Sequence, residues 1–372
     1  MIDYKGAYMN KRILYIMNVD WDWIKQRPQF LAEELSKEFS VDVVQPINYR
    51  RHNLVKDHNR KLKLHYWFQL PFGRFSIIRK INKVLMWVYF KFFIDIKQYE
   101  VVWLTTPIYY PAIQSLISLN QKVIYDCMDD NAVFPGLPSA LEFCTSEKQL
   151  VSRADHLFFS SNYLMDVILK RYQICDIEKA TIVNNALIPG MVACEEPKEE
   201  NIKSMDHTIH ITYIGTIASW LDFKLLEKSL NKFPNIQFEL YGPIEKGVEY
   251  NHSRVVCHGP IPHNDVIKVM QESDALIMPF QLIPLVMSVN PVKLYEYISS
   301  MKPIICVSYK ETQAFEKFVY SYHNDDECLA LINDLVNGKL KFKSTREEVN
   351  KFLTENTWDT RGKEVRNILL AL

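Results

Sequence analysis

Glycine is scarce in this sequence, with 10 among 372 residues, and neither sign of charge is in excess. Lysine plus arginine and aspartate plus glutamate each number 44, so the net charge offers no case for nucleic-acid binding. The seven cysteines form no Cys-X-X-Cys pair and are odd in number. This pattern predicts reduced cytosolic thiols, most of them in the core.

Long apolar segments are also missing. The sequence contains no run of 18 apolar residues, so we expect no membrane-spanning helix. Residues 1–6 are polar and do not resemble a signal peptide, which predicts a cytoplasmic chain.

The composition that remains is typical of a soluble globular protein, with 48% hydrophobic and 24% charged residues. A length of 372 residues suggests two ordinary domains. The chain opens with an apolar run at 11–18, an amphipathic stretch at 27–39 and a second apolar run at 41–44. This β-α-β order predicts an α/β fold with a parallel sheet. Residues 191–206 are acidic, polar and contain proline, and they are the best candidate for an interdomain linker.

Residues 288–307 combine a loop, a helix and a buried strand. We expect Asn290 to cap the helix and Pro291 to occupy its first position. A helix that begins in this way offers N–H groups and a positive dipole end to a phosphate, and Lys293 adds charge there. Glu296 follows one and a half turns later, where its carboxylate can accept two hydrogen bonds from a vicinal diol such as a ribose. The alternative is an ordinary capped helix with Glu296 on its solvated face.

This stretch resembles a known motif. Asn290-Pro-Val-Lys-Leu-Tyr-Glu-Tyr, followed by Lys302-Pro303 and a hydrophobic strand, is similar to the donor-binding motif of GT-B glycosyltransferases. The similarity is greatest to the family-4-like branch that builds bacterial surface polysaccharides. In that family the glutamate binds the nucleotide ribose and the helix start holds the diphosphate. Many members carry another glutamate eight positions earlier, where this sequence has Ser288, so the sugar stays open.

The resemblance implies two Rossmann-like domains facing a cleft, and it covers nearly the whole chain. The implied domains are residues 1–190 for the acceptor, residues 207–355 for the nucleotide sugar, and a last helix at 356–372 that packs back on the first domain. The implied donor-binding residues are Gly215, Thr216, Tyr241, Gly242, His258, Ser288, Asn290, Val292, Lys293, Leu294 and Glu296. Lys293 would neutralise the leaving diphosphate as a catalytic residue. The family favours retention of configuration and does not require a metal, so we expect no cofactor beyond the nucleotide-sugar co-substrate.

Two stretches of the first half suit an acceptor. The loop after the first strand has no glycine-rich fingerprint, but it carries Asp20, Trp21 and Arg27, which suit a sugar ring and its hydroxyls. Alternatively, it is a tryptophan-anchored loop with an arginine at a helix start. Asp126, Asp129 and Asp130 end another expected strand, and Asp126 is the candidate base for an inverting reaction. The alternatives are a turn capped by Asp126 with two solvated carboxylates or, more weakly, a metal site.

Residues 74–97 predict a long aromatic-rich helix with a basic side formed by Arg74, Arg79, Lys80 and Lys83. Such a helix suits the headgroup region of an anionic bilayer, here the inner face of the cell membrane. The alternative is a core helix whose exposed turn is basic. A membrane surface is what a lipid-linked glycan acceptor would require.

The sequence therefore predicts a glycosyltransferase of surface-polysaccharide synthesis that transfers a sugar from a nucleotide-diphosphate sugar to a lipid-linked saccharide. Two alternatives stay open. One is a GT-B-like sugar-nucleotide 2-epimerase, which would need no acceptor. The other is a non-catalytic partner that binds nucleotide sugar or glycan, a reading suggested by Ser288.

Overall fold

The computed structural model describes residues 11–22, 25–47, 62–133, 139–187, 190–194 and 208–372. The chain divides into two compact units: unit 1 comprises Met1–Asn185 with Trp358–Leu372, and unit 2 comprises Ala186–Thr357. The division falls five residues before the predicted end of the first domain at residue 190. Most of the predicted linker, residues 195–206, lies outside the described residues.

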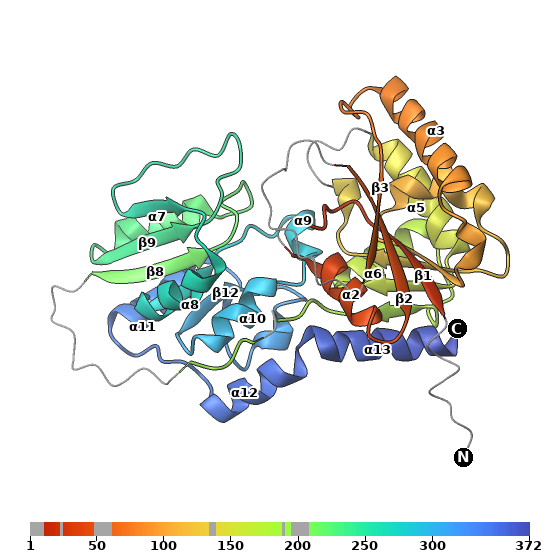
Figure 1. Ribbon diagram of the computed structural model, residues 1–372. Coiled ribbons are helices and arrows are strands. Elements are labelled where there is room, and N and C mark those ends of the chain that lie inside the picture. Colours follow the sequence, from red (N-terminus) through yellow and green to blue (C-terminus); the bar gives the residue numbers. More distant parts are fainter. Residues whose placement is uncertain (1–10, 23–24, 48–61, 134–138, 188–189, 195–207) are drawn as a thin grey trace, which may run out of the picture. The chain divides into compact units, whose positions relative to one another are not determined.

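Unit 1 is built on a seven-stranded parallel sheet in the order β3-β2-β1-β4-β5-β6-β7 (Figure 1). The strands are β1 (Arg12–Ile16), β2 (Ser40–Pro46), β3 (Lys63–Trp67), β4 (Val101–Leu104), β5 (Lys122–Cys127), β6 (His156–Phe159) and β7 (Ala180–Ile182). The helices are α2 (Arg27–Leu35), α3 (Ser76–Phe92), α4 (Tyr110–Ile113), α5 (Ala140–Arg153), α6 (Asn162–Tyr172) and α13 (Trp358–Ala371). Short 3-10 turns lie at Ile96–Gln98, Pro107–Tyr109, Gln114–Leu116 and Asn131–Val133.

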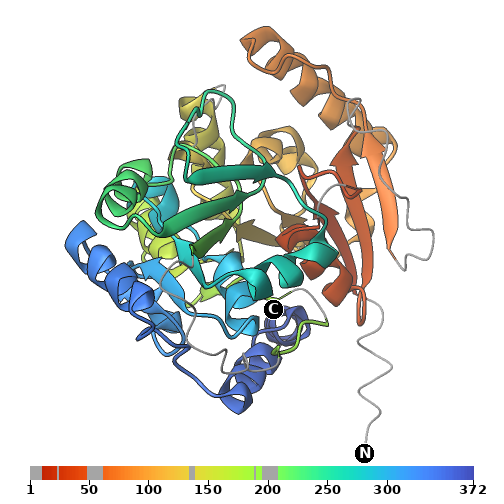
Figure 2. The ribbon, with the colours of Figure 1, turned by 90° about the vertical axis from the view of Figure 1, so that its left-hand side faces the viewer.

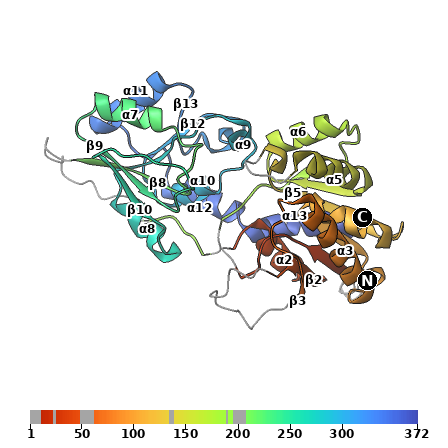
Figure 3. The same ribbon diagram turned by 90° about the horizontal axis from the view of Figure 1, so that it is seen from above.

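Helices cover both faces of this sheet, which explains why its strands are continuous apolar runs rather than alternating ones. Figure 3 shows α5 and α6 on one side and α2 and α13 on the other. The C-terminal helix α13 packs on α2, where Phe30 stacks on Trp358 with ring centroids 5.0 Å apart. The last fourteen helical residues therefore belong to the core of unit 1, although they follow unit 2 in the sequence.

Unit 2 has a six-stranded parallel sheet in the order β10-β9-β8-β11-β12-β13. The strands are β8 (Ile209–Ile214), β9 (Ile236–Tyr241), β10 (Val255–Gly259), β11 (Ala275–Met278), β12 (Ile304–Val307) and β13 (Tyr320–Tyr322). The helices are α7 (Phe223–Lys232), α8 (His263–Glu272), α9 (Pro284–Met287), α10 (Val292–Ser299), α11 (Asp325–Val336) and α12 (Arg346–Glu355), with a 3-10 turn at Gln313–Phe315. Figure 3 places α7 and α11 on one side of the sheet and α8 and α10 on the other.

In both sheets the strand order reverses at the first strand, β1 or β8, so each unit has the topological switch point where open α/β folds bind ligands. The described helices include none that combines the length and the apolar composition that a bilayer crossing needs. Three of the seven cysteines are buried, two are half-buried and two are exposed, so the prediction of mostly core thiols was wrong.

Two predicted helices are shorter in the structure. The stretch at 27–39 is helical only to Leu35, and the stretch at 74–97 only from Ser76 to Phe92. The second helix ends because Ile94 turns into the core and Asp95 caps a separate 3-10 turn. Figure 2 shows α3, coloured orange, at the periphery of unit 1.

Candidate functional site

The predicted phosphate seat is the start of α10. The helix begins at Val292, with Pro291 rather than Asn290 at the N-cap, and no side chain caps it. The capping role predicted for Asn290 was therefore wrong: its side-chain oxygen accepts a hydrogen bond from Tyr295 Oη at 3.3 Å instead. The helix ends shortly before Met301, which adopts a left-handed conformation (φ 58°) and directly precedes Lys302-Pro303.

Helix α10 is attached to the carboxyl end of β8. Tyr297 is fully buried, and its hydroxyl accepts a hydrogen bond from the backbone N–H of Ile214 at 2.7 Å. Ile214 is the residue before Gly215. This bond therefore fixes α10 against β8, the strand that leads to the predicted donor-binding residue Gly215. Leu294 is a core residue with no exposed side chain, which leaves only its backbone for the predicted donor contact.

Lys293 and Glu296 form an ion pair one turn apart on α10, with 2.7 Å between Nζ and Oε2. Their exposures differ sharply: the Lys293 side chain is 34% exposed and that of Glu296 only 3%. The alternative that placed Glu296 on a solvated face was therefore wrong. The buried carboxylate is thus held in position by a partly exposed ammonium, which remains accessible to a ligand.

Two glycine loops meet at the carboxyl ends of β8 and β9. Gly215 donates its N–H to the carbonyl of Tyr241 at 2.8 Å, and Gly242 donates to the carbonyl of Gly259 at 2.8 Å. Gly242 has a φ of 143°, and a Cβ there would lie 1.9 Å from the Gly215 carbonyl oxygen. Gly242 is thus needed for backbone to pack on backbone, whereas a Cβ on Gly215 would lie 2.5 Å from the Tyr213 hydroxyl. Thr216, which follows Gly215, is exposed.

Beyond these loops lies a flat pair of rings. Tyr241, at the end of β9, stacks on His258 with ring centroids 4.2 Å apart and planes 7° from parallel. The register of β10 against β9 shifts between Cys257 and Gly259, so His258 sits in a bulge that turns its ring onto the tyrosine. The predicted donor residues Tyr241 and His258 are therefore brought together.

Glu239 holds this ring pair in place and was missed by sequence reasoning. Its carboxylate contacts His258 Nε2 at 2.5 Å and His210 Nδ1 at 2.8 Å, and accepts a bond from Gln237 at 2.7 Å. Burial raises the pKa of Glu239, but the hydrogen bonds from His258, His210 and Gln237 outweigh it, so the pKa is lowered overall. The signal was available, because Gln237, Glu239 and Tyr241 alternate along one strand and therefore share a face.

Ser288 does not present its side chain to a donor. It follows α9, is fully buried, and its hydroxyl donates to the Leu285 carbonyl at 2.7 Å. The predicted donor role of Ser288 conflicts with this geometry, because the hydroxyl already serves the turn between α9 and α10.

In unit 1, Asp126 and Arg27 bind each other. Arg27 donates to Asp126 Oδ1 from Nε at 3.0 Å and from Nη2 at 2.7 Å, and its Nη1 donates to the Val183 carbonyl. The Arg27 side chain is 4% exposed and that of Asp126 not at all. This environment contradicts the alternative in which Asp126 caps a turn. The base role of Asp126 and the acceptor role of Arg27 stay predictions, which the enclosure of both side chains disfavours. The pair ties β5 to the end of β7.

Asp130 is also committed to the fold. It receives two hydrogen bonds from Arg171, at 2.8 and 2.5 Å, and is 3% exposed. The alternative that Asp130 is simply solvated was therefore wrong, and its acceptor role stays a prediction that this ion pair does not favour. Trp21 is also held in the fold. Its side chain is buried, and its backbone N–H donates to Gln45 Oε1 at 2.7 Å. This fits the alternative of a tryptophan-anchored loop, in which Asp20 bonds the Asp22 N–H at 3.1 Å.

Asp129 differs from Asp126 and Asp130, because its carboxylate is not held in an ion pair with another described residue. It is half-buried at the carboxyl edge of the sheet, and no hydrogen bond joins its carboxylate to another described residue. Burial raises the pKa of Asp129 to about 6, with a further rise from the negative charge of Asp126 and an opposing effect of Arg27. A carboxylate with that pKa can exchange a proton near neutral pH. In the described part of the chain, no group of three or more His, Cys, Asp or Glu side chains is placed to hold a metal ion.

The comparisons with known proteins agree with this architecture. No family model matches the chain. It is 28% identical over 245 residues to TuaH of Bacillus subtilis (strain 168), a protein assigned as a teichuronic acid biosynthesis glycosyltransferase. That match covers 62% of this chain and 61% of TuaH, so it spans less than two thirds of the relative.

Solved structures match over nearly the full length at low identity. Sucrose-phosphate synthase from Thermosynechococcus elongatus gives a TM-score of 0.71 at 12% identity, covering 97% of this chain and all of that one. The lipopolysaccharide outer core galactosyltransferase WaaB gives 0.64 at 13% identity over 97% and 99% of the two chains. HepE from Anabaena, in complex with UDP, gives 0.66 at 11% identity over 97% and 100%.

The chain has the GT-B fold. The resemblance stated from residues 290–307 is thereby confirmed at the level of the fold, with two units that each carry a parallel sheet. At identities of 11–13%, these structural matches show the fold and not the activity.

Proposed function

We propose that this chain transfers a sugar from a nucleotide-diphosphate sugar to a saccharide acceptor in the synthesis of a bacterial surface polysaccharide. The observation that carries the proposal is the Lys293–Glu296 pair at the start of α10, which Tyr297 fixes against the carboxyl end of β8. The match to TuaH supports the polysaccharide setting.

The donor would be recognised by three features of unit 2. The N–H groups at the start of α10 and the Lys293 ammonium face the diphosphate, whose charge rises as the glycosidic bond breaks. The buried Glu296 accepts the two ribose hydroxyls. The Tyr241–His258 pair offers a flat aromatic surface to a base, and UDP is the nucleotide we would test first.

Lys293 would change partners on binding. The pair with Glu296 leaves the ammonium 34% exposed, so it can turn to a phosphate oxygen while the diol takes its place on the carboxylate. The two residues therefore act as a coupled pair, and replacing either one alters the other.

The acceptor side would use Asp129. The resemblance to family-4 enzymes favours retention, which needs no conventional base. For an inverting reaction the base would be Asp129 rather than Asp126, because Asp129 is half-buried with a pKa of about 6 and Asp126 is enclosed by Arg27.

Incubation with a panel of UDP-sugars and a saccharide acceptor tests the proposal. We expect UDP release with a new glycoside, and the product's anomeric configuration gives the stereochemical course. A changed sugar without acceptor would instead show a 2-epimerase, and binding without turnover would show a non-catalytic partner. Parallel reactions with a chelator test the expectation that no metal is required.

We further propose that the acceptor is lipid-linked and that α3 lies on the anionic inner face of the cell membrane. Ile77, Ile81 and Val84 follow one another at helical spacing and are exposed, with Val84 60% accessible. Only Met86 and Phe90 of α3 are buried, so the alternative of a core helix was wrong. Anionic headgroups contribute about 1 kcal/mol per nearby basic residue.

The basic side of α3 differs from the predicted set in one member. Arg79 donates to both oxygens of Glu142 on α5, at 2.7 and 3.0 Å, so it serves the fold and not a headgroup. Arg74 and Lys80 are exposed and Lys83 is half-buried, and these three remain for a membrane.

Vesicle sedimentation tests whether these basic residues bind an anionic membrane. The triple replacement of Arg74, Lys80 and Lys83 by glutamine should abolish co-sedimentation with anionic vesicles, whereas neutral vesicles bind neither protein. A matched control replaces Lys148 and Lys170, which are exposed elsewhere on unit 1, and should bind as wild type. Salt-insensitive binding, or equal binding of the triple variant, would exclude the membrane role. Activity on a short soluble acceptor should survive the triple replacement.

A further inference from the structure

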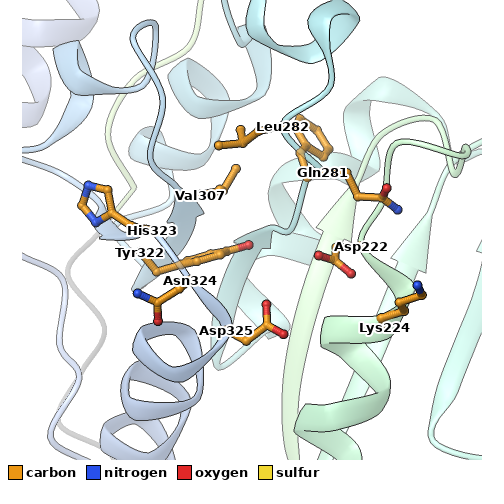
Figure 4. A pocket seen from close by; sticks show the side chains of 10 residues that line it. Asp222, Lys224, Gln281, Leu282, Val307, Tyr322, His323, Asn324 and Asp325 are labelled. Carbon is orange, nitrogen blue, oxygen red and sulfur yellow. The ribbon is translucent and has the colours of Figure 1, made fainter.

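Unit 2 contains a recess that lies apart from the predicted donor residues. It occupies about 330 Å³ where β11, β12 and β13 end, between the starts of α7 and α11 (Figure 4). Phe280, Gln281 and Leu282 follow β11 and form one wall, and Tyr322 ends β13. This volume is within the range of small-ligand sites, at its lower end. None of the lining residues belongs to the set predicted to bind a nucleotide sugar.

The hydroxyl of Tyr322 is the observation that points to a ligand. The residue is 3% exposed, and its hydroxyl is buried without a hydrogen-bond partner among the described residues. Figure 4 shows the ring lying across the recess, with the hydroxyl toward the side of Asp222 and Gln281. Buried hydroxyls in folded proteins nearly always have a partner, so an unused one that is directed into a recess is a candidate contact.

The charges around the recess restrict the class of ligand. Asp222 and Asp325 contribute two carboxylates and Lys224 an ammonium, and Lys228 on α7 forms an ion pair with Asp325, so the charges balance. The two helix starts are already capped: Asp222 Oδ1 accepts the Leu225 N–H at 3.0 Å, and Asn324 accepts the Glu327 N–H at 3.0 Å. An anion would therefore meet no excess of positive charge and two occupied helix ends, which argues against a phosphate or a sugar acid.

We infer that this recess binds a neutral saccharide unit. Carboxylate and amide oxygens accept hydrogen bonds from sugar hydroxyls, the Tyr322 hydroxyl donates to a sugar oxygen, and Phe280 and Leu282 meet the apolar face of the ring. Leu282 is 42% exposed, so it can move aside to admit a ring to the covered hydroxyl. The inference is drawn from the recess alone and does not depend on the proposed function.

The test uses the full chain saturated with UDP, so that a sugar does not enter through the nucleotide site. Methyl α-glucoside and methyl N-acetylglucosaminide are titrated at millimolar concentration by ligand-observed NMR, with glucuronic acid as the charged comparison. Tyr322→Phe should weaken glycoside binding by about three- to tenfold, the range for one neutral hydrogen bond. Asp222→Asn should weaken it comparably while keeping the cap of α7, because asparagine caps helices as well as aspartate.

Tyr250→Phe is the matched control, because the hydroxyl of Tyr250 is also buried and unpartnered among the described residues but lies outside the recess. It should leave glycoside binding unchanged, and thermal melting should show that Tyr322→Phe folds as wild type. The inference is overturned if wild type binds neither glycoside, if binding is equal in Tyr322→Phe, or if glucuronic acid binds more tightly. A failure of UDP binding in the same samples would count against the proposed function and not against the recess.

Discussion

The charged groups at the carboxyl edges of the two sheets have opposite fates. In unit 1, Arg27 and Asp126 are both enclosed, with side chains 4% and 0% exposed, and they join two strands. In unit 2, Glu296 is as deeply buried as Asp126, but its partner Lys293 is 34% exposed. A pair with one accessible member can exchange that member for a ligand, whereas a fully enclosed pair cannot. An ion pair between a cationic and an acidic side chain thus joins strands in unit 1, whereas in unit 2 such a pair leaves its cation accessible.

The largest effect should come from breaking the enclosed pair. Arg27→Ala leaves Asp126 buried and unpaired, which should lower the free energy of unfolding by about 3–5 kcal/mol. Urea denaturation measures it, and Lys293→Ala should cost less, because removing the partly exposed Lys293 opens the buried Glu296 to water. An Arg27→Ala protein of unchanged stability that has lost activity would reverse the assignment and restore an acceptor role.

The second effect concerns the accessible member of the other pair. If Lys293 neutralises the leaving diphosphate, Lys293→Ala should lower kcat by about 10²-fold and change KM for the donor much less, because the charge grows in the transition state. Steady-state kinetics with a UDP-sugar measure both. A rise in KM with unchanged kcat would make Lys293 a passive anchor.

The third prediction concerns Asp129, a carboxylate of unit 1 that is not enclosed in an ion pair with a described residue. The raised pKa of Asp129 means that the folded chain binds this proton more tightly than the unfolded chain does. Its contribution to stability is fully present below pH 4 and is lost as the pH rises through about 6. Asp129→Asn should remove this loss and raise stability above pH 6 by about 2 kcal/mol, allowing for partial exposure. Denaturation at pH 4, 6 and 8 measures it, and parallel pH curves for both proteins would count against the shifted pKa.

The smallest effect concerns the diol. Glu296→Ala should weaken donor binding at least tenfold, since the loss of even one hydrogen bond to a charged group costs about 1.5 kcal/mol. Calorimetric titration with UDP measures it, and 2′,3′-dideoxy-UDP provides the control, because it should bind both proteins alike. An unchanged affinity for UDP itself would rule out the ribose role.

Sequence patterns predicted much of the fold because they depend on short-range physics. Apolar runs such as 11–18 and 41–44 predict buried strands wherever helices cover both faces of a sheet. The helix after residue 290 follows from local spacing, and so do the phosphate and diol roles that we propose for its start and for Glu296. The resemblance to GT-B glycosyltransferases, read from the same residues, holds for the fold.

Tertiary structure alone decided which polar groups remained available. Three aspartates in five residues look equivalent in sequence, yet Asp126 meets Arg27, which is 99 positions away, and Asp130 meets Arg171, which is 41 away. Asp129 lies between them without such a partner. Likewise Arg79 pairs with Glu142, and the hydroxyl of Tyr322 has no hydrogen-bond partner among the described residues, although neither neighbourhood is local in the chain. Ion pairs and hydrogen bonds act over a few ångströms of space, so partners that the fold brings together from distant strands and helices leave no periodic signal in the sequence.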